Sequence, residues 1–154
     1  MKILDFLAPE AININLQATS KQAVLEELVE ALVKTGKVTD RKKVLDVLLE
    51  REELGSTGIG HCIAIPHGKS DAVTELAASF ALSRSGVAFD ALDGEPVNIF
   101  FMLVAPEGSA GTHLKALARI SGLLKDKFFL KNLLAAQSRE EVLKVIEEEE
   151  KARH

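Results

Sequence analysis

Hydrophobic and polar residues follow two different periods in the N-terminal part of the chain. Residues 12–16, Ile-Asn-Ile-Asn-Leu, alternate with a period of two, which predicts a half-buried strand. Apolar residues then recur at helical spacing from Val24 to Leu32. Thr19 and Gln22 have the spacing of a capping box, and Gly36 has the position of a C-terminal cap, so we expect a helix between these two caps.

A second helix is predicted to begin at Asp40, with its apolar face between Val44 and Leu49 and with Gly55 just past its end. Arg51 falls in the last turn of this helix. We therefore expect the Arg51 side chain to project near the glycine-rich stretch that follows.

The next part of the chain predicts two strands separated by a loop. Large and small residues alternate over 76–82, which indicates a strand. Residues 84–96 contain a glycine and an Asp-Gly turn and are expected to form a loop. Residues 97–104 form a nearly unbroken apolar run rich in β-formers, which is typical of a strand covered on both faces.

Helices dominate the C-terminal third. Residues 105–111 are expected to form a loop, after which Thr112 is predicted to cap a helix running to about Lys127. A short helix is expected around 128–136, and a last one opens with the capping box Ser-Arg-Glu-Glu at 138–141. Strands alternate with helices along the chain, which predicts an α/β fold with a sheet covered by helices.

Composition narrows the class of protein. The 154 residues are 47% hydrophobic and 27% charged, which is typical of one folded domain, here 1–154 with a core at about 3–147. The net charge of −4 and the scattered basic residues argue against nucleic-acid binding. No apolar run is long enough for membrane insertion, and the N-terminus does not resemble a signal peptide, so we expect a cytoplasmic protein. Cys62 is the single cysteine, which excludes a disulfide framework.

The stretch from Arg51 to Asp71 carries most of the candidate chemistry, because it holds four glycines and two histidines. Glycine-rich loops can turn backbone amides towards a small anion. The residues expected to form such a loop are Gly55, Ser56, Thr57, Gly58 and Gly60.

His67 stands between Pro66 and Gly68, at the end of a short strand-like run over 62–65. A ring held there has one nitrogen free for chemistry and the other available to an acceptor. His113 falls in the first turn of a helix that follows a buried strand, where α/β folds collect ligands. The two histidines can converge at this edge, although the pattern does not fix whether they meet.

Three other chemistries compete with histidine nucleophilicity. His61, Cys62, His67 and His113 are the ligand types that zinc prefers, but adjacent His61 and Cys62 would face opposite ways in an extended chain. Ser56 and Ser109 are weak candidates for a hydrolytic nucleophile, because no GxSxG elbow is present. The glycine order also lacks the GxxxxGK[ST] pattern of a P-loop. A histidine that attacks phosphorus remains, and it needs a nearby cation and amide donors.

The run Arg-Glu-Glu-Leu-Gly-Ser-Thr-Gly-Ile-Gly from Arg51, followed by Ile-Ala-Ile-Pro-His-Gly, resembles the active-site motif of the fructose/mannitol-type enzyme IIA family of the bacterial phosphotransferase system (PTS). The resemblance extends over nearly the whole chain, through Phe-Asp-Ala-Leu-Asp-Gly (89–94), the strand and loop at 100–107, and His-Leu-Lys-Ala-Leu-Ala-Arg-Ile (113–120). It implies a mixed β-sheet flanked by helices on both faces.

The resemblance also implies a phosphohistidine carrier that needs no cofactor. His67 would accept a phosphoryl group from HPr or its nitrogen-branch counterpart and pass it to a cysteine of a IIB domain. His113 would stabilise the transferring group, and Arg51 would neutralise its charge. The same resemblance covers a nitrogen-branch regulator that binds target proteins, so a carrier for fructose-type sugar transport and a regulator both stay open.

The chain departs from the family pattern at Cys62, where the family commonly has glycine. Cys62 is interpreted as a small residue tolerated in a loop, and a redox-sensitive thiol is the alternative. His61 is treated as a neighbour of the site without an assigned role. His154, at the end of the chain, is expected to be mobile.

Overall fold

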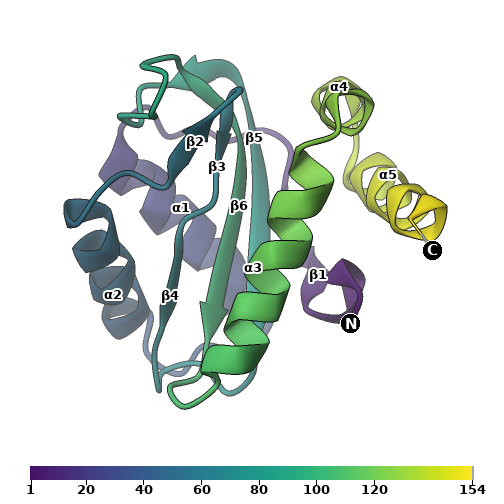
Figure 1. The fold of residues 1–154 in the computed structure, drawn as a ribbon. Helices are drawn as coiled ribbons and strands as arrows, with labels where there is room; N and C mark the ends of the chain where they lie inside the picture. The colour runs from purple at the N-terminus through teal and green to yellow at the C-terminus, as the bar shows by residue number, and fades with distance from the viewer. Residues whose placement is uncertain (154) are drawn as a thin grey trace.

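The structure is a computed structural model that describes residues 1–153; His154, expected to be mobile, lies outside the described residues. It contains one mixed sheet with helices on both faces, which confirms the predicted fold class (Figure 1). The elements are the short 3₁₀ helix η1 (Ile3–Asp5), β1 (Leu7–Asn13), α1 (Lys21–Val33), α2 (Arg41–Glu53), β2 (Gly58–Gly60), β3 (Ile63–Ala64), β4 (His67–Lys69), β5 (Ala77–Val87), β6 (Val97–Ala105), α3 (Ala110–Leu124), α4 (Lys127–Ala135) and α5 (Arg139–Ala152).

The sheet runs in the order β1-β5-β6-β3-β2, and β4 also pairs with β6. The β5–β6 and β2–β3 pairs are antiparallel, whereas β1 pairs with β5, and β3 and β4 pair with β6, in parallel. The segment from β3 to β4 therefore follows β6 as one interrupted strand. Pro66 lies at the interruption, and its carbonyl accepts a hydrogen bond from Leu103 N (2.9 Å).

Two hydrophobic cores lie on opposite faces of the sheet. On one face α1 and α2 pack against β5 and β6 through residues such as Leu28, Val44 and Phe100. On the other face α3, α4 and α5 pack through residues such as Ile120 and Phe129. Side chains of the central strands alternate between these cores, as expected for a strand covered on both faces.

The helix predictions hold at α2 and shift by one residue at α1. Asp40 is the N-cap of α2, and its carboxylate accepts a hydrogen bond from Lys43 N (3.2 Å). The prediction of Thr19 as the cap of α1 is wrong. The N-cap is Ser20, whose hydroxyl accepts a hydrogen bond from Ala23 N (3.3 Å).

Two predicted strand boundaries are also wrong. The strand expected at 12–16 overlaps β1 only at Ile12 and Asn13, because β1 already begins at Leu7. It ends at Asn13, whose side chain accepts the amide of Asn15 and forms a local turn. The loop expected at 84–96 begins later, since β5 continues to Val87 through a bulge and pairs there with Val97.

The helix expected from Thr112 to about Lys127 begins and ends earlier. Ser109 is the residue before α3, so Thr112 lies inside the first turn and does not cap it. Lys127 instead begins α4, which Asp126 caps by accepting the amides of Phe128 and Phe129. His113 nevertheless lies in the first turn of α3, as the sequence predicted.

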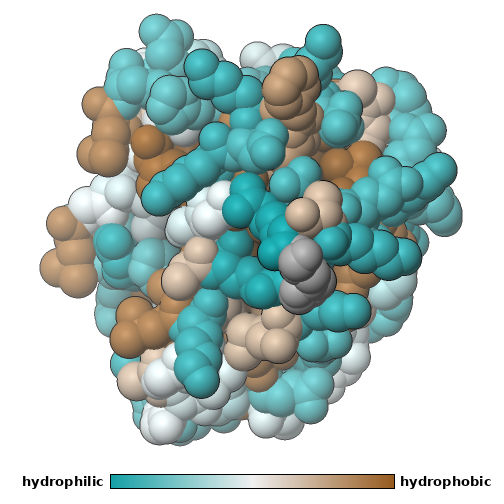
Figure 2. Space-filling view, turned by 45° about the vertical axis from the view of Figure 1, so that its right-hand side comes forward, coloured by the Kyte–Doolittle hydropathy of each residue, from teal (hydrophilic) through white to brown (hydrophobic). Residues whose placement is uncertain are grey.

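Among residues 1–153, no helix has the length and apolar character needed to cross a membrane. Figure 2 brings the α4 and α5 side of the molecule forward and shows hydrophilic residues over most of this face. Hydrophobic residues form separate small groups there, as on an ordinary protein surface.

Candidate functional site

His67 is the first residue of β4, and its neighbour in the sheet is Leu103 of β6. Partners in adjacent strands direct their side chains to the same face, and Leu103 belongs to the core beneath α3. The His67 ring therefore lies on the α3 side of the sheet. Gly68 keeps the strand close to α2, because an added Cβ would approach Val47 Cγ1 to 2.7 Å.

The His67 ring is fixed by a hydrogen bond between Nδ1 and the carbonyl oxygen of Ile65 (2.8 Å). A carbonyl oxygen can only accept, so Nδ1 carries the proton and neutral His67 keeps its lone pair on Nε2. The ring is half-buried. The sequence predicted this division between a held and a free nitrogen, and the Ile65 contact confirms it.

His113 lies next to His67, with ring centroids 5.7 Å apart and planes at 72°. The sequence left open whether the two histidines meet, and in the structure they do. His113 is buried, and burial, followed by the positive charges that His67 and Lys69 can carry, lowers the pKa of His113 from 6.5 to about 4. His113 is therefore neutral at physiological pH.

The Nε2 atom of His113 is buried and has no hydrogen-bond partner within residues 1–153. An unpaired buried polar atom costs about 1–3 kcal/mol, and a catalytic role is one of the reasons why a native protein keeps one. Lys69, two residues after His67 on the same face of β4, adds a cation that the sequence analysis did not single out. The His-x-Lys spacing on a strand was the available signal.

Arg51, His67 and the start of the glycine loop line one shallow hollow of about 200 Å³. The α3 residues Leu117 and Ser121 form its opposite side. Arg51 Nη1 donates to the carbonyl oxygen of Gly55 (2.8 Å), so the side chain projects towards the glycine-rich stretch, as predicted from its place in the last turn of α2. Arg51 and His67 thus line one opening.

Several amides of the expected anion loop already have acceptors inside the protein. Gly55 N donates to Glu52 O (3.2 Å), Thr57 N to the Glu52 carboxylate (3.2 Å), and Gly58 N to Ser56 Oγ (3.0 Å). The loop is therefore held from within, and its role as an anion cradle stays a prediction. Gly60 lies further on, at the end of β2.

Glu52 anchors this loop and was missed in the sequence, where it stands among charged residues at a helix end. It is 7% exposed, and its carboxylate accepts the backbone amide and the hydroxyl of Thr57. Lys21 Nζ lies 3.2 Å from the same carboxylate and 4.9 Å from the centre of the Phe89 ring. A buried carboxylate with these partners fixes the backbone that leads from Arg51 into the hollow.

His61 and Cys62 form the two-residue turn between β2 and β3, both with positive φ (55° and 65°). The Asp93 carboxylate accepts the amide of His61 (3.1 Å) and ties this turn to the loop before β6. Burial and the Asp93 charge raise the pKa of the Cys62 thiol, so the neutral thiol predominates at physiological pH. This environment favours the structural interpretation of Cys62 over a reactive thiol.

The geometry gives little support to a zinc site or to Ser56 as a hydrolytic nucleophile. Within residues 1–153, no three His, Cys, Asp or Glu side chains gather in a way that could hold a metal ion. Ser56 Oγ donates to Phe89 O (2.8 Å), so this hydroxyl is bound to the backbone and not to a histidine.

Known proteins are similar to this chain over most of its length. The family model described as "Phosphoenolpyruvate-dependent sugar phosphotransferase system, EIIA 2" matches residues 5–149. The chain is 40% identical over 151 residues to the PTS system fructose-specific EIIABC component of Bacillus subtilis, covering 98% of this chain and 24% of that protein. It is 42% identical over 147 residues to the nitrogen regulatory protein of Bradyrhizobium diazoefficiens, covering 95% of each.

Solved structures give the same family. The nitrogen regulatory protein IIA-Ntr from Neisseria meningitidis superposes with a TM-score of 0.87 at 34% identity, covering 94% of this chain and 98% of that one. Enzyme IIA-Mtl, solved in complex with phosphorylated enzyme IIB-Mtl from Escherichia coli, superposes with a TM-score of 0.77 at 25% identity, covering 90% and 94%. The chain therefore belongs to the EIIA type 2 family of the phosphoenolpyruvate-dependent sugar phosphotransferase system.

Proposed function

We propose that this chain carries a phosphoryl group on Nε2 of His67, receiving it from phospho-HPr or a nitrogen-branch counterpart. The observation that carries this proposal is the 2.8 Å contact between His67 Nδ1 and Ile65 O, which engages one ring nitrogen and leaves Nε2 as the nitrogen available for attack, on a residue that lines the hollow with Arg51. A neutral imidazole with a free lone pair is the form of histidine that attacks phosphorus.

In the proposed step, the Nε2 lone pair of His67 forms a bond to phosphorus while the bond between phosphorus and the donor histidine breaks. The transition state spreads negative charge over three equatorial oxygens. Arg51 supplies a positive charge at the hollow, and His113 Nε2 supplies a hydrogen bond to a phosphoryl oxygen when its proton is on that nitrogen. The unpaired state of His113 Nε2 in the free protein supports this role.

Onward transfer reverses these bonds. A thiolate of a IIB domain attacks phosphorus, and the P–N bond to His67 breaks. The IIA-Mtl relative was solved together with a phosphorylated IIB partner, which supports a IIB domain as acceptor for this chain. We propose fructose-type sugar uptake as the process served, on the likeness to the B. subtilis fructose-specific component, of which the chain spans about a quarter.

A second candidate function is regulation in the nitrogen branch, where the phosphorylation state of His67 controls binding to target proteins. The TM-score of 0.87 to IIA-Ntr of N. meningitidis favours it. Both candidate functions use the same phosphohistidine chemistry. They differ only in whether a IIB domain accepts the phosphoryl group or a target protein binds according to the phosphorylation state.

The proposal is tested by intact-mass measurement after incubation with phosphoenolpyruvate, enzyme I and HPr. We expect one acid-labile phosphoryl group on the wild type and none on His67→Ala. Addition of a fructose-type IIB domain then separates the two candidates, because a transport carrier loses its phosphoryl group to IIB and a dedicated regulator keeps it. A folded wild type that accepts no phosphoryl group from either donor branch would refute the carrier chemistry.

A further inference from the structure

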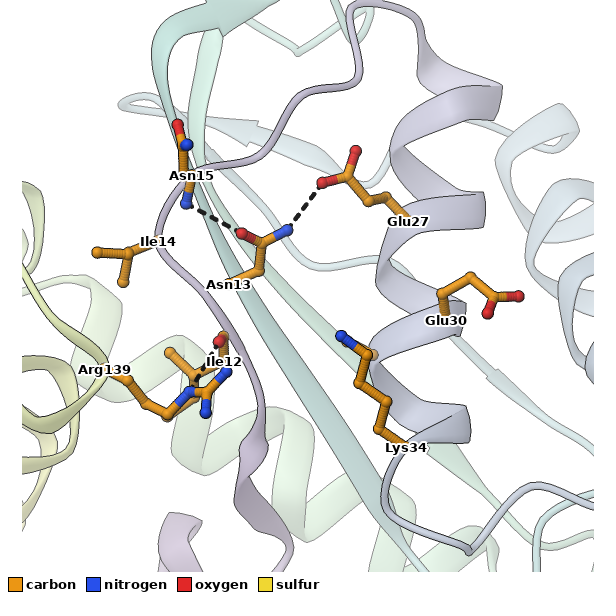
Figure 3. Close-up of a pocket in the computed structure, with 9 residues that line it drawn as sticks. Ile12, Asn13, Ile14, Asn15, Glu27, Glu30, Lys34 and Arg139 are labelled. Carbon is orange, nitrogen blue, oxygen red and sulfur yellow. Dashed lines mark hydrogen bonds between the residues drawn. The ribbon is translucent and has the colours of Figure 1, made fainter.

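A second concave site lies at the opposite edge of the sheet from His67. β1 is the last strand on that side, and its outer edge opens into a groove of about 390 Å³ between α1 and α5 (Figure 3). The floor of this β1-edge groove is residues 12–15. One wall is Glu27, Glu30 and Ala31 of α1 with Lys34, which caps the end of α1, and the other wall is Arg139 of α5. Its volume lies within the range of small-molecule sites.

The carboxylates of the β1-edge groove are already committed to other groups. Glu27 accepts hydrogen bonds from Asn13 Nδ2 (2.8 Å), Ala18 N (3.0 Å) and Gln17 N (3.1 Å). Glu30 forms an ion pair with Arg41 of α2. Their negative charges are therefore largely satisfied.

The two cations of the groove, Lys34 and Arg139, still have hydrogen-bond donors and positive charge available to a ligand. Arg139 donates only through Nε, to Ile12 O (3.3 Å), and neither Arg139 nor Lys34 forms an ion pair with any residue in 1–153. Figure 3 shows the Lys34 side chain extending from α1 towards β1, with Arg139 reaching the strand from the other wall. An anion placed between them would gain a fork-shaped donor from Arg139 and a point charge from Lys34.

The strand edge itself favours a small occupant over an added strand. Pro9 removes one amide donor from β1, and Arg139 already occupies the Ile12 carbonyl, so a continuous ladder along this edge is blocked. Ile14 and Ala31 add an apolar surface beside the two cations.

We propose that the β1-edge groove binds a small organic anion, with its carboxylate or phosphate between Lys34 and Arg139 and its carbon chain against Ile14 and Ala31. The site is separate from His67, because β5 and β6 lie between β1 and β4 in the sheet. Binding in this groove therefore requires neither phosphoryl transfer at His67 nor a partner docked there.

The test is an NMR titration of ¹⁵N-labelled full-length chain with succinate and, separately, with glycerol 3-phosphate. We expect saturable shifts confined to the amides of residues 12–15, Ala31, Lys34 and Arg139. Lys34→Gln should weaken the affinity about tenfold, as for loss of one charged hydrogen bond. Lys131→Gln, which removes an exposed lysine from α4, is the matched control and should bind as the wild type does.

Tighter binding of one probe identifies the head group as carboxylate or phosphate. Shifts that do not saturate with either probe, that spread over all lysine-rich surfaces, or that are unchanged in Lys34→Gln would overturn the proposal. Within residues 1–153 the Lys34 side chain forms no hydrogen bond or ion pair, so we expect Lys34→Gln to fold as the wild type does. Arg139→Gln serves as a second variant once its melting temperature is checked.

Discussion

The rings of His67 and His113 lie side by side, but the two residues come from segments that are built in different ways. His113 lies in the first turn of the 15-residue helix α3, so the hydrogen bonds of one regular element hold its backbone. His67 lies on the three-residue strand β4, shortly after a turn with two residues at positive φ. The loop and turn before it depend on the carboxylates of Glu52 and Asp93. The geometry at His67 therefore depends on side chains from other segments, whereas that at His113 depends on the backbone hydrogen bonds of one helix.

The largest expected effect separates the roles of the two histidines. His67→Ala should abolish phosphoryl acceptance, because no other group occupies the position of Nε2. His113→Ala should still accept a phosphoryl group but transfer it onward about 100-fold more slowly, as for loss of one donor at a transition state. Single-turnover transfer to a IIB domain measures this difference. A His113→Ala variant that transfers at the wild-type rate would remove His113 from the mechanism.

Glu52→Ala tests how far the His67 segment depends on outside support. The change leaves the Thr57 amide and Lys21 without their buried partner, so we expect a loss of about 3 kcal/mol in the free energy of unfolding. Urea unfolding followed by circular dichroism provides the measurement. Glu53→Ala, at the exposed neighbouring position, is the control and should stay within about 0.5 kcal/mol of the wild type. Equal effects of the two changes would contradict the anchoring role.

Stability in acid should report on His113. The folded protein holds the pKa of His113 at about 4, below the 6.5 of an unfolded chain, so between these values the unfolded state binds more protons. The contribution is complete above pH 6.5 and is lost as the pH falls towards 4, by about 2–3 kcal/mol. His113→Gln should lose correspondingly less stability between pH 7 and pH 4.5 in urea titrations. Parallel curves for the two proteins would show that His113 titrates normally.

The smallest expected effect concerns the turn before His67. Cys62 has φ of 65°, a conformation that costs a side-chain-bearing residue about 1 kcal/mol and glycine little. Cys62→Gly relieves this strain but loses the burial of a half-buried thiol. The net effect should be a rise of about 0.5–1 kcal/mol in the free energy of unfolding. Thermal unfolding measures the gain, and phosphoryl acceptance should not change. A lower melting temperature would mean that packing of the thiol outweighs the backbone strain.

The long elements were predictable from the sequence, and among the three short strands only β3 was, within the strand-like run over 62–65. The spacing from Val24 to Leu32 is sufficient to place α1, because a helical stripe repeats over several turns. β2 and β4 have three residues each, too few for any period to show. They exist because β6 and β3 offer partners, which is a tertiary effect.

The candidate site divides in the same way. His67, His113 and Arg51 were found from their residue types and flanking motifs. Glu52 was not, because a glutamate near a helix end normally faces solvent and only the position of Lys21 makes its burial favourable. The β1-edge groove was also not predictable, since it joins residues 12–15 with Arg139 more than a hundred positions away.

The interruption of the strand at Pro66 affects whether the His67 ring gains or loses a proton during phosphoryl transfer. It turns the Ile65 carbonyl to the His67 ring, where it holds the Nδ1 proton in place. If that hydrogen bond persists when phosphorus binds Nε2 and when it leaves, the ring neither takes up nor releases a proton in either direction. Transfer through His67 should then show a solvent deuterium isotope effect near unity, and its equilibrium should be set by the donor and acceptor proteins rather than by the pH around this ring.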